Sequence, residues 1–245
     1  MLRVGLTGSL GSGKSTAARL FAAHGAQILQ SDAIGRELMQ PGQTVYAAIV
    51  ERFGSGVVLP DGQLDRPALA KIAFTDGRVE ELNAIVHPAV IARQAELTEA
   101  IFERDPRAVV IVESALIFET NYGETKCAEE NPSETHDAVQ SGEKGRWHRR
   151  FDRTILVTAP EEIKIARFIA RSAAGTEVTE ARRESLEAEA RKRLAQQLPD
   201  ERKSSLVDYI LTNAGPIAEL EWQVDQLWPI LQTAAAQPSV ATQDH

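Results

Sequence analysis

The stretch GLTGSLGSGKST, residues 5–16, joins a short apolar run to a helical pattern close to the beginning of the chain. The alternation of apolar residues in 2–6 predicts a strand, and apolar residues at helical spacing in 15–24 predict a helix. Glycines between a strand and a helix allow a ligand to approach the backbone closely. We therefore expect an α/β fold with a ligand site at the end of its first strand.

The glycine-rich stretch satisfies the pattern G-x-x-x-x-G-K-[ST] between a strand and a helix. Glycines let successive N–H groups reach phosphate oxygens, and the following helix adds the positive end of its dipole. In this interpretation Lys14 contacts the β- and γ-phosphates, and the Ser15 hydroxyl is a ligand for Mg²⁺. The expected ATP-binding residues are Gly11, Ser12, Gly13, Lys14, Ser15 and Thr16.

The alternative interpretation is a glycine-rich turn that matches by chance. At ordinary residue frequencies the bare pattern arises in a chain of this length at about the one-per-cent level. The strand–loop–helix context favours phosphate binding. The pattern alone does not distinguish a kinase from a switch GTPase or a motor ATPase.

Composition narrows the class of protein further. The net charge is −8 at pH 7 and the pI is about 5.3, so no global basic field attracts nucleic acid. The single cysteine, Cys127, cannot form an internal disulfide, which fits a reducing compartment. We see neither a signal peptide nor an apolar run of membrane-spanning length. These features predict a soluble, cytoplasmic protein with no nucleic-acid or membrane partner.

Strand-like and helical segments alternate along the chain, as in a parallel α/β sheet. The further strands are expected at 26–32, 108–112, 153–158 and 208–213, and a closing helix at about 217–231. Residues 33–104 have a mostly helical pattern. Residues 120–151 are polar and rich in turn-forming residues, which indicates a functional loop or a solvated insertion. Residues 233–245 are expected to be a flexible tail.

Two carboxylates follow predicted strands. Asp32 follows the second strand, where it could orient or deprotonate a hydroxyl that attacks the γ-phosphate, or simply cap a helix that begins at Ala33. Glu113 ends the strand at 108–112, where it could hold the outer sphere of Mg²⁺ or simply mark the solvent boundary.

Other polar residues have similar alternatives. His87 precedes a proline at the expected end of a helix and is either structural or a ligand contact. Arg167 and Arg171 share one helix face, so they form either a flap over phosphates or part of a solvated charged helix. Arg193 and Gln197 repeat this spacing with the same two interpretations. No cluster has the spacing of a zinc site.

Several stretches occur in an order that resembles the dephospho-CoA kinase family. They cover most of residues 1–231. The glycine loop is shared with many kinases, but the middle stretches are more specific to this family. In chain order the stretches are VGLTGSLGSGKST, SDAIGREL, FGSGVVLPDGQLDRPALAKIAF, LNAIVHP, ESALIFE and RLAQQLPDERKSSLVDYILTNAG.

The resemblance implies a P-loop kinase fold, an α/β fold with a parallel five-stranded sheet flanked by helices. It also implies a helical acceptor-binding subdomain and a helical lid. The implied reaction transfers the γ-phosphoryl group of ATP to the ribose 3′-hydroxyl of dephospho-CoA, with Mg²⁺. We expect one domain over 1–232, with its core at 1–32, 105–165 and 205–232, the subdomain at 33–104 and the lid at 166–200.

The resemblance also implies roles for individual residues. Asp32 is favoured to orient or deprotonate the acceptor hydroxyl, and Thr7 faces the same site. Arg171 is expected to reach the transferring phosphate, with Lys14 also acting in catalysis. Arg66 and His87 match positions near the acceptor.

The chain departs from the family pattern at two places. The usual Asp-Ala-Asp after the second strand is Gln30-Ser31-Asp32 here. Glu113 and Ala115 replace the Asp and Pro of another motif, so the metal role of Glu113 does not follow directly from the resemblance.

Other classes of protein remain open at this stage. A nucleoside or nucleotide kinase would share the loop and lid but accept a free nucleotide. A nucleotide-dependent switch or binding protein is a different class, although no NKxD-type guanine-recognition segment is present. The expected assembly is a monomer or a weak homo-oligomer.

Overall fold

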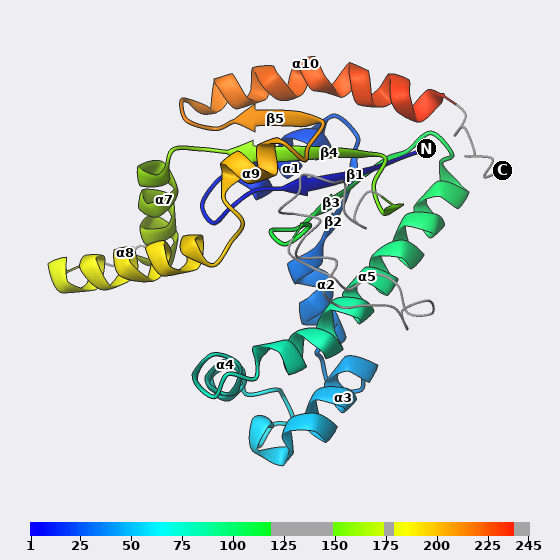
Figure 1. The fold of residues 1–245 in the computed structure, drawn as a ribbon. Helices are drawn as coiled ribbons and strands as arrows, with labels where there is room; N and C mark the ends of the chain where they lie inside the picture. The colour runs from blue at the N-terminus through cyan, green and yellow to red at the C-terminus, as the bar shows by residue number, and fades with distance from the viewer. Residues whose placement is uncertain (119–148, 174–178, 238–245) are drawn as a thin grey trace. The chain divides into compact units, whose positions relative to one another are not determined.

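The computed structural model describes residues 1–118, 149–173 and 179–237 (Figure 1). The described chain divides into two compact units. The core unit contains residues 1–29, 100–118 and the described residues from 149 onward, and the helical unit contains residues 30–99. The predicted subdomain was 33–104. The division at the later boundary falls inside one continuous helix, so no loop or turn marks it in the sequence.

The core unit is built on a five-stranded parallel sheet in the order β2-β3-β1-β4-β5, as the sequence predicts. In the register of the central strands Val4 pairs with Ile111, and Leu6 pairs with Ile155. The strands are β1 (Leu2–Thr7), β2 (Gln27–Gln30), β3 (Val109–Glu113), β4 (Arg153–Thr158) and β5 (Tyr209–Thr212).

Helices occur in both units: they lie beside the sheet in the core unit and make up most of the helical unit. Those of the core unit are α1 (Lys14–Ala23), α7 (Glu161–Ala173), α8 (Glu180–Ala195), α9 (Asp200–Ser204) and α10 (Ile217–Ala236). Those that begin in the helical unit are α2 (Ser31–Leu38), α3 (Thr44–Phe53), a 3₁₀ turn (Ser55–Val57), α4 (Arg66–Ala70), a π-helical turn (Lys71–Thr75) and α5 (Val79–Arg104), which ends in the core unit.

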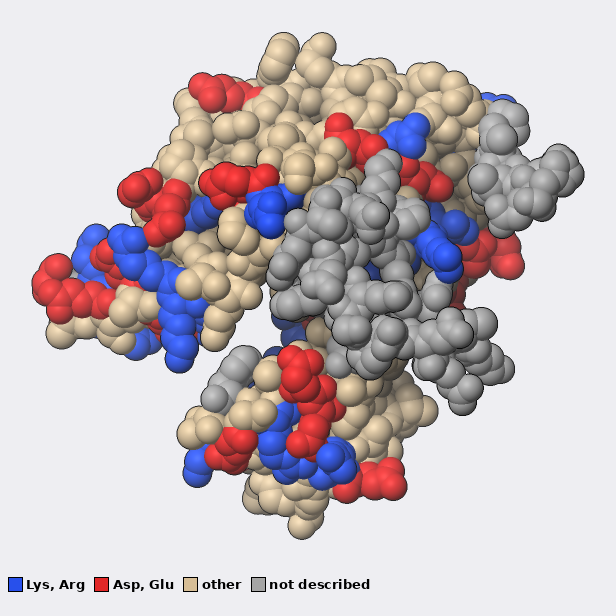
Figure 2. Space-filling model, viewed as in Figure 1, with Lys and Arg blue, Asp and Glu red and all other residues tan. Residues whose placement is uncertain are grey.

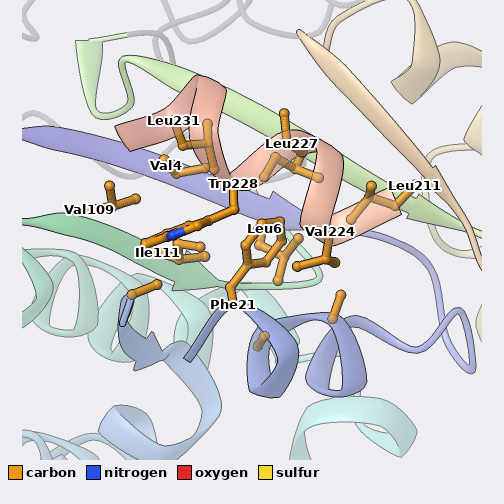
Figure 3. Packing of buried hydrophobic residues seen from close by; sticks show 14 of the residues in the cluster. Val4, Leu6, Phe21, Val109, Ile111, Leu211, Val224, Leu227, Trp228 and Leu231 are labelled. Atoms are coloured by element: carbon orange, nitrogen blue, oxygen red, sulfur yellow. The ribbon is translucent and has the colours of Figure 1, made fainter. Parts of the chain in front are cut away.

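One face of the sheet packs against α1 and α10 (Figure 3). Phe21 of α1 is fully buried, and its ring lies 6.4 Å from that of Trp228 on α10. The buried residues of α10 recur every three or four positions, which gives this helix one apolar side. The buried residues of this helix are Leu220, Val224, Leu227, Trp228, Leu231 and Ala235.

The other face of the sheet buries alternate residues of the same strands. Val112 of β3 packs with Ile117, Phe118 and Phe151. All five residues of β3 are buried, which is typical of a central parallel strand covered on both sides. The two layers hold the carboxyl ends of β1 and β3 in fixed register, and the glycine-rich loop begins there.

Several predicted boundaries are wrong. The second strand ends at Gln30, so Ser31 and Asp32 belong to α2 and not to the strand. The short polar side chains of both residues suit a helix start, which the strand prediction ignored. The predicted tail from 233 is wrong for residues 233–236, because α10 continues to Ala236 and buries Ala235.

Most of the predicted polar insertion 120–151 lies outside the described residues. The last residue of this segment, Phe151, is not part of a solvated insertion, because it is buried in the core. Arg150 lies with its guanidinium 5.0 Å from the Phe151 ring centroid, and burial lowers the pKa of Arg150 to about 10. The chain therefore rejoins the core before residue 152.

Candidate phosphate-binding site

The loop between β1 and α1 requires glycine at Gly8, Gly11 and Gly13, because an added Cβ at each would overlap neighbouring atoms. Gly11 has φ 72° and Gly13 has φ 98°, a region that other residues rarely adopt. A Cβ at Gly11 would overlap the carbonyl of Lys164, and one at Gly13 would overlap the side-chain amide of Asn213. Neighbouring residues therefore lie against the loop backbone at Gly11 and Gly13. The first amides of α1 are the ones expected to bind phosphate.

Lys14 is the first residue of α1, and its side chain folds back over the loop. Its Nζ donates to the carbonyl oxygen of Gly8 at 2.8 Å and to that of Ser9 at 3.1 Å. These bonds hold a positive charge above the first half of the loop. An anion that enters the loop can therefore pair with an ammonium already in place.

Buried hydroxyl groups lie in and beside the loop. Thr7 and Ser12 are both fully buried, and their hydroxyl oxygens have no hydrogen-bond partner among the described residues. A buried polar atom without a partner costs about 1–3 kcal/mol. The Ser12 hydroxyl is therefore an unsatisfied polar group in the interior of the glycine-rich loop.

Ser15 and Glu113 are brought together from two elements. The Ser15 hydroxyl, on α1, donates to Glu113 Oε1 at 2.6 Å, at the carboxyl end of β3. Glu113 is only 9% exposed, whereas Ser15 is exposed. Hydroxyl and carboxylate oxygens are ligands that Mg²⁺ accepts, so this pair fits a magnesium site beside the loop.

Asn213 contacts the second half of the loop. Asn213 was not identified as a site residue from the sequence. Its Nδ2 donates to the Ser12 carbonyl at 2.9 Å. Arg167 on α7 donates to the Asn213 carbonyl at 3.0 Å and to its Oδ1 at 3.2 Å. Arg167 therefore acts on the loop through Asn213. Asn213 was expected as the last residue of the strand at 208–213 and lies in a stretch that resembles the family, but neither signal assigned it a contact with the loop.

Arg171 lies one turn further along α7. Its guanidinium is 5.9 Å from the centroid of the Phe168 ring, and that of Arg193 on α8 is 5.5 Å from the same centroid. Arg193 also donates to Glu189 at 2.6 Å. Basic and acidic side chains are interspersed on the face of α8 that Figure 2 shows. Helices α7 and α8 thus carry arginines, and the Arg193 charge is partly balanced by a neighbouring carboxylate.

Three predicted site residues lie in the helical unit. Asp32 is exposed in the first turn of α2, where the helix dipole favours a carboxylate. Arg66 begins α4, directly after Asp65, whose side chain accepts from the Ala68 amide at 3.0 Å.

The helix expected to end at His87 is wrong, because α5 continues through Pro88 to Arg104. Burial lowers the pKa of His87 and favours its neutral form.

The structure therefore groups the predicted site residues by unit. Thr7, the loop 11–16 and Glu113 lie together at the carboxyl end of β1 and β3 in the core unit, with Arg171 on α7 of that unit. Asp32, Arg66 and His87 belong to the helical unit.

The described residues contain neither a membrane-spanning helix nor a cluster of potential metal ligands. In residues 1–118, 149–173 and 179–237 no helix is both long and apolar enough to span a membrane. Within the same ranges, no three His, Cys, Asp or Glu side chains gather into a potential metal site.

The parallel sheet and the loop between β1 and α1 together define a P-loop kinase fold. A crystal structure of a Thermus thermophilus protein matches with a TM-score of 0.65 and 28% identity, covering 94% of this chain and 97% of that one. The structure of dephospho-CoA kinase from Campylobacter jejuni matches with a TM-score of 0.54 and 19% identity, covering 94% and 96%, which shows the shared fold.

Sequence comparison identifies the family. The family profile for dephospho-CoA kinase matches residues 2–129. The dephospho-CoA kinase of Streptomyces avermitilis is 36% identical over 97% of this chain and 98% of its own length. That of Thermobifida fusca is 34% identical over 95% and 97%. The chain belongs to the dephospho-CoA kinase family.

Proposed function

We propose that this chain transfers the γ-phosphoryl group of ATP to the ribose 3′-hydroxyl of dephospho-CoA, giving CoA and ADP. The observation that carries the proposal is the glycine-rich loop with Lys14 folded over it, in a chain of this family. Family membership supports ATP and dephospho-CoA as substrates. Cytoplasmic localisation and a monomer or weak homo-oligomer stay predictions.

The chemistry that we propose is mainly positional and electrostatic. The amides at the start of α1 bind the β- and γ-phosphates, and the Lys14 ammonium moves from the loop carbonyls to phosphate oxygens. Arg171 stabilises charge on the transferring group. Gly11 and Gly13 are required because a side chain at either position would collide with its surroundings.

In the proposed mechanism Asp32 acts as the general base. Its carboxylate orients the 3′-hydroxyl and accepts its proton as the ribose oxygen attacks. A bond forms between this oxygen and the γ-phosphorus, the bond from that phosphorus to the bridging oxygen breaks, and ADP leaves with that electron pair. The exposure of Asp32 supports this role, because a substrate hydroxyl can reach an exposed carboxylate.

Ser15 and Glu113 are the residues that we expect to hold Mg²⁺ with the nucleotide. When bound, the ion neutralises charge on the β- and γ-phosphate oxygens. Glu113 is the buried acceptor for the Ser15 hydroxyl and therefore fixes its orientation. Thr7 lines the base of the site, and Arg66 and His87 are proposed to lie near the acceptor.

An acceptor-dependence assay tests this function. ADP release is measured with ATP and Mg²⁺ in the presence of dephospho-CoA, AMP, adenosine or buffer alone. We expect stimulation by dephospho-CoA only. Stimulation by AMP or adenosine in its place would move the chain to the nucleotide or nucleoside kinases, and the absence of any stimulation would contradict kinase activity of either kind.

A further inference from the structure

The first half of the phosphate loop is held by the segment that follows α8. The Leu10 amide donates to Gln197 Oε1 at 2.9 Å, although the two residues are far apart in the sequence. Gln197 lies two residues beyond the end of α8. The Leu10 amide therefore points toward the base of the lid helices.

Asp200, three residues after Gln197, fixes this segment to the sheet. Its Oδ2 accepts from Lys164 Nζ at 2.5 Å and from the Thr158 hydroxyl at 2.7 Å. The Lys164 and Asp200 side chains are only 9% and 11% exposed. Burial opposes ionisation of Asp200, but the hydrogen bonds from Lys164 and Thr158 together with the Lys164 charge hold its pKa below the usual range.

Polar contacts accompany apolar packing at this junction, because the partly buried Leu10 side chain packs against a cluster that includes Leu186 and Ala190 of α8. A pocket of about 520 Å³ opens beside them, between the phosphate loop, the turn after β4, and α8 and α9. Ser9, Gln197 and Asp200 are among its lining residues. Apolar packing holds the Leu10 side chain, and the bond to Gln197 fixes the direction of the Leu10 amide.

Gln197 is connected through the loop to the residues that bind phosphate. Leu10 is bonded to Ser9, whose carbonyl accepts from Lys14 at 3.1 Å. Leu10 also precedes Gly11, which packs directly against the Lys164 carbonyl. Displacement of Leu10 would move both the Lys14 anchor and the amides that follow, and displacements of about 1 Å weaken phosphate positioning markedly.

We propose that Gln197 is a positioning residue that keeps the phosphate loop in its ATP-binding geometry by holding the Leu10 amide. It does so with the Lys164–Asp200 pair as a fixed base. The inference rests on the proposed function only in taking ATP as the ligand of the loop. It makes no use of the identity of the acceptor.

The test compares Gln197→Met with Gln196→Met. The first replaces the acceptor of the Leu10 amide by a side chain of similar length. The second makes the same change at the neighbouring, exposed residue. Gln197→Asn is a second test variant, since its amide is one methylene too short to reach Leu10. ATP affinity is measured by calorimetry without acceptor, KM and kcat with dephospho-CoA, and Tm for each protein.

We expect both Gln197 variants to raise the Kd and KM for ATP about tenfold, as for the loss of one hydrogen bond. Because the Leu10 amide loses its partner, the Tm falls by about 2–4 °C. The KM for dephospho-CoA stays near that of the parent, and Gln196→Met behaves as the parent. Unchanged ATP affinity in the Gln197 variants, or an equal rise for ATP and acceptor, would overturn the proposal. Failure of the parent to phosphorylate dephospho-CoA would contradict the proposed function and leave the calorimetric result valid.

Discussion

Asp32 and Lys14 act at different stages of the proposed reaction, so their variants separate chemistry from binding. Asp32→Asn keeps the size of the side chain but removes the carboxylate that accepts the hydroxyl proton. We expect kcat to fall by about 10²–10⁴-fold, with the Kd for ATP within about twofold of the parent. Single-turnover kinetics and ATP titration measure the two effects.

The matched comparison for Asp32 is Lys14→Ala, which removes the ammonium held over the loop. It should weaken ATP binding and turnover together. A near-normal kcat for Asp32→Asn would leave Asp32 with only its role in the first turn of α2.

His87 gives a pH-dependent prediction. Burial lowers its pKa in the folded chain, whereas the unfolded chain has the usual value of about 6.5. Its contribution to stability is therefore fully present above about pH 6.5. It is lost as the pH falls toward the folded pKa, with a slope of at most about 1.4 kcal/mol per pH unit.

Replacement of His87 by Gln removes this titration. We expect the loss of unfolding free energy between pH 7.5 and 5.5 to be smaller in His87→Gln than in the parent, as measured by urea denaturation at each pH. Identical pH slopes for the two proteins would show that His87 protonates equally well in the folded and unfolded chains.

At the level of elements, the Lys164–Asp200 pair connects the first turn of α7 with the start of α9. Asp200→Asn leaves the Lys164 ammonium buried beside a neutral amide. We expect it to lower the free energy of unfolding by about 3 kcal/mol at pH 7. Denaturant titration of the parent and the variant measures this difference.

The control is the double variant Lys164→Met with Asp200→Asn, which removes the uncompensated charge and should recover part of the loss. Because the folded pKa of Asp200 is lowered, its contribution is present above the unfolded value of about 3.9 and is lost as the pH falls through the folded value. Equal stability of the parent and Asp200→Asn at pH 7 would contradict a stabilising pair.

The elements that could be predicted from the sequence are those with strong local patterns. The strand at 153–158 has the predicted bounds, and the first helix begins at Lys14, one residue earlier than expected. The expected helix end at His87 is wrong, because α5 continues through Pro88. Proline removes a helical hydrogen bond and crowds the preceding turn, but Val86 and Ala89 beside it pack against the apolar cluster of the helical unit.

Only the part of the candidate site that is formed by residues adjacent in the sequence could be predicted. The glycine loop has its own spacing, so its position and its lysine followed from the pattern. The bonds of Leu10 with Gln197 and of Ser12 with Asn213 join residues from opposite ends of the chain. No periodicity or local motif encodes such a pair, because it exists only once the sheet and the helices around it have assembled.

For the whole molecule, the division into two units matters for the proposed mechanism. The groups expected to bind ATP lie in the core unit, and the carboxylate expected to activate the acceptor lies in the helical unit. The family comparison covers both units, with 97% of the chain aligned to one relative. The proposed reaction therefore needs residues of both units, whereas the residues proposed to bind phosphate all lie in the core unit.

The central claim concerns the bond that forms, so the most direct test is the structure of the product. The full chain is incubated with ATP, Mg²⁺ and dephospho-CoA, and the purified product is analysed by ³¹P NMR and mass spectrometry. The account predicts one new phosphomonoester on the ribose 3′ oxygen, formed in equal amount to ADP. A product phosphorylated at another position, or ADP formed without any phosphorylated acceptor, would contradict it.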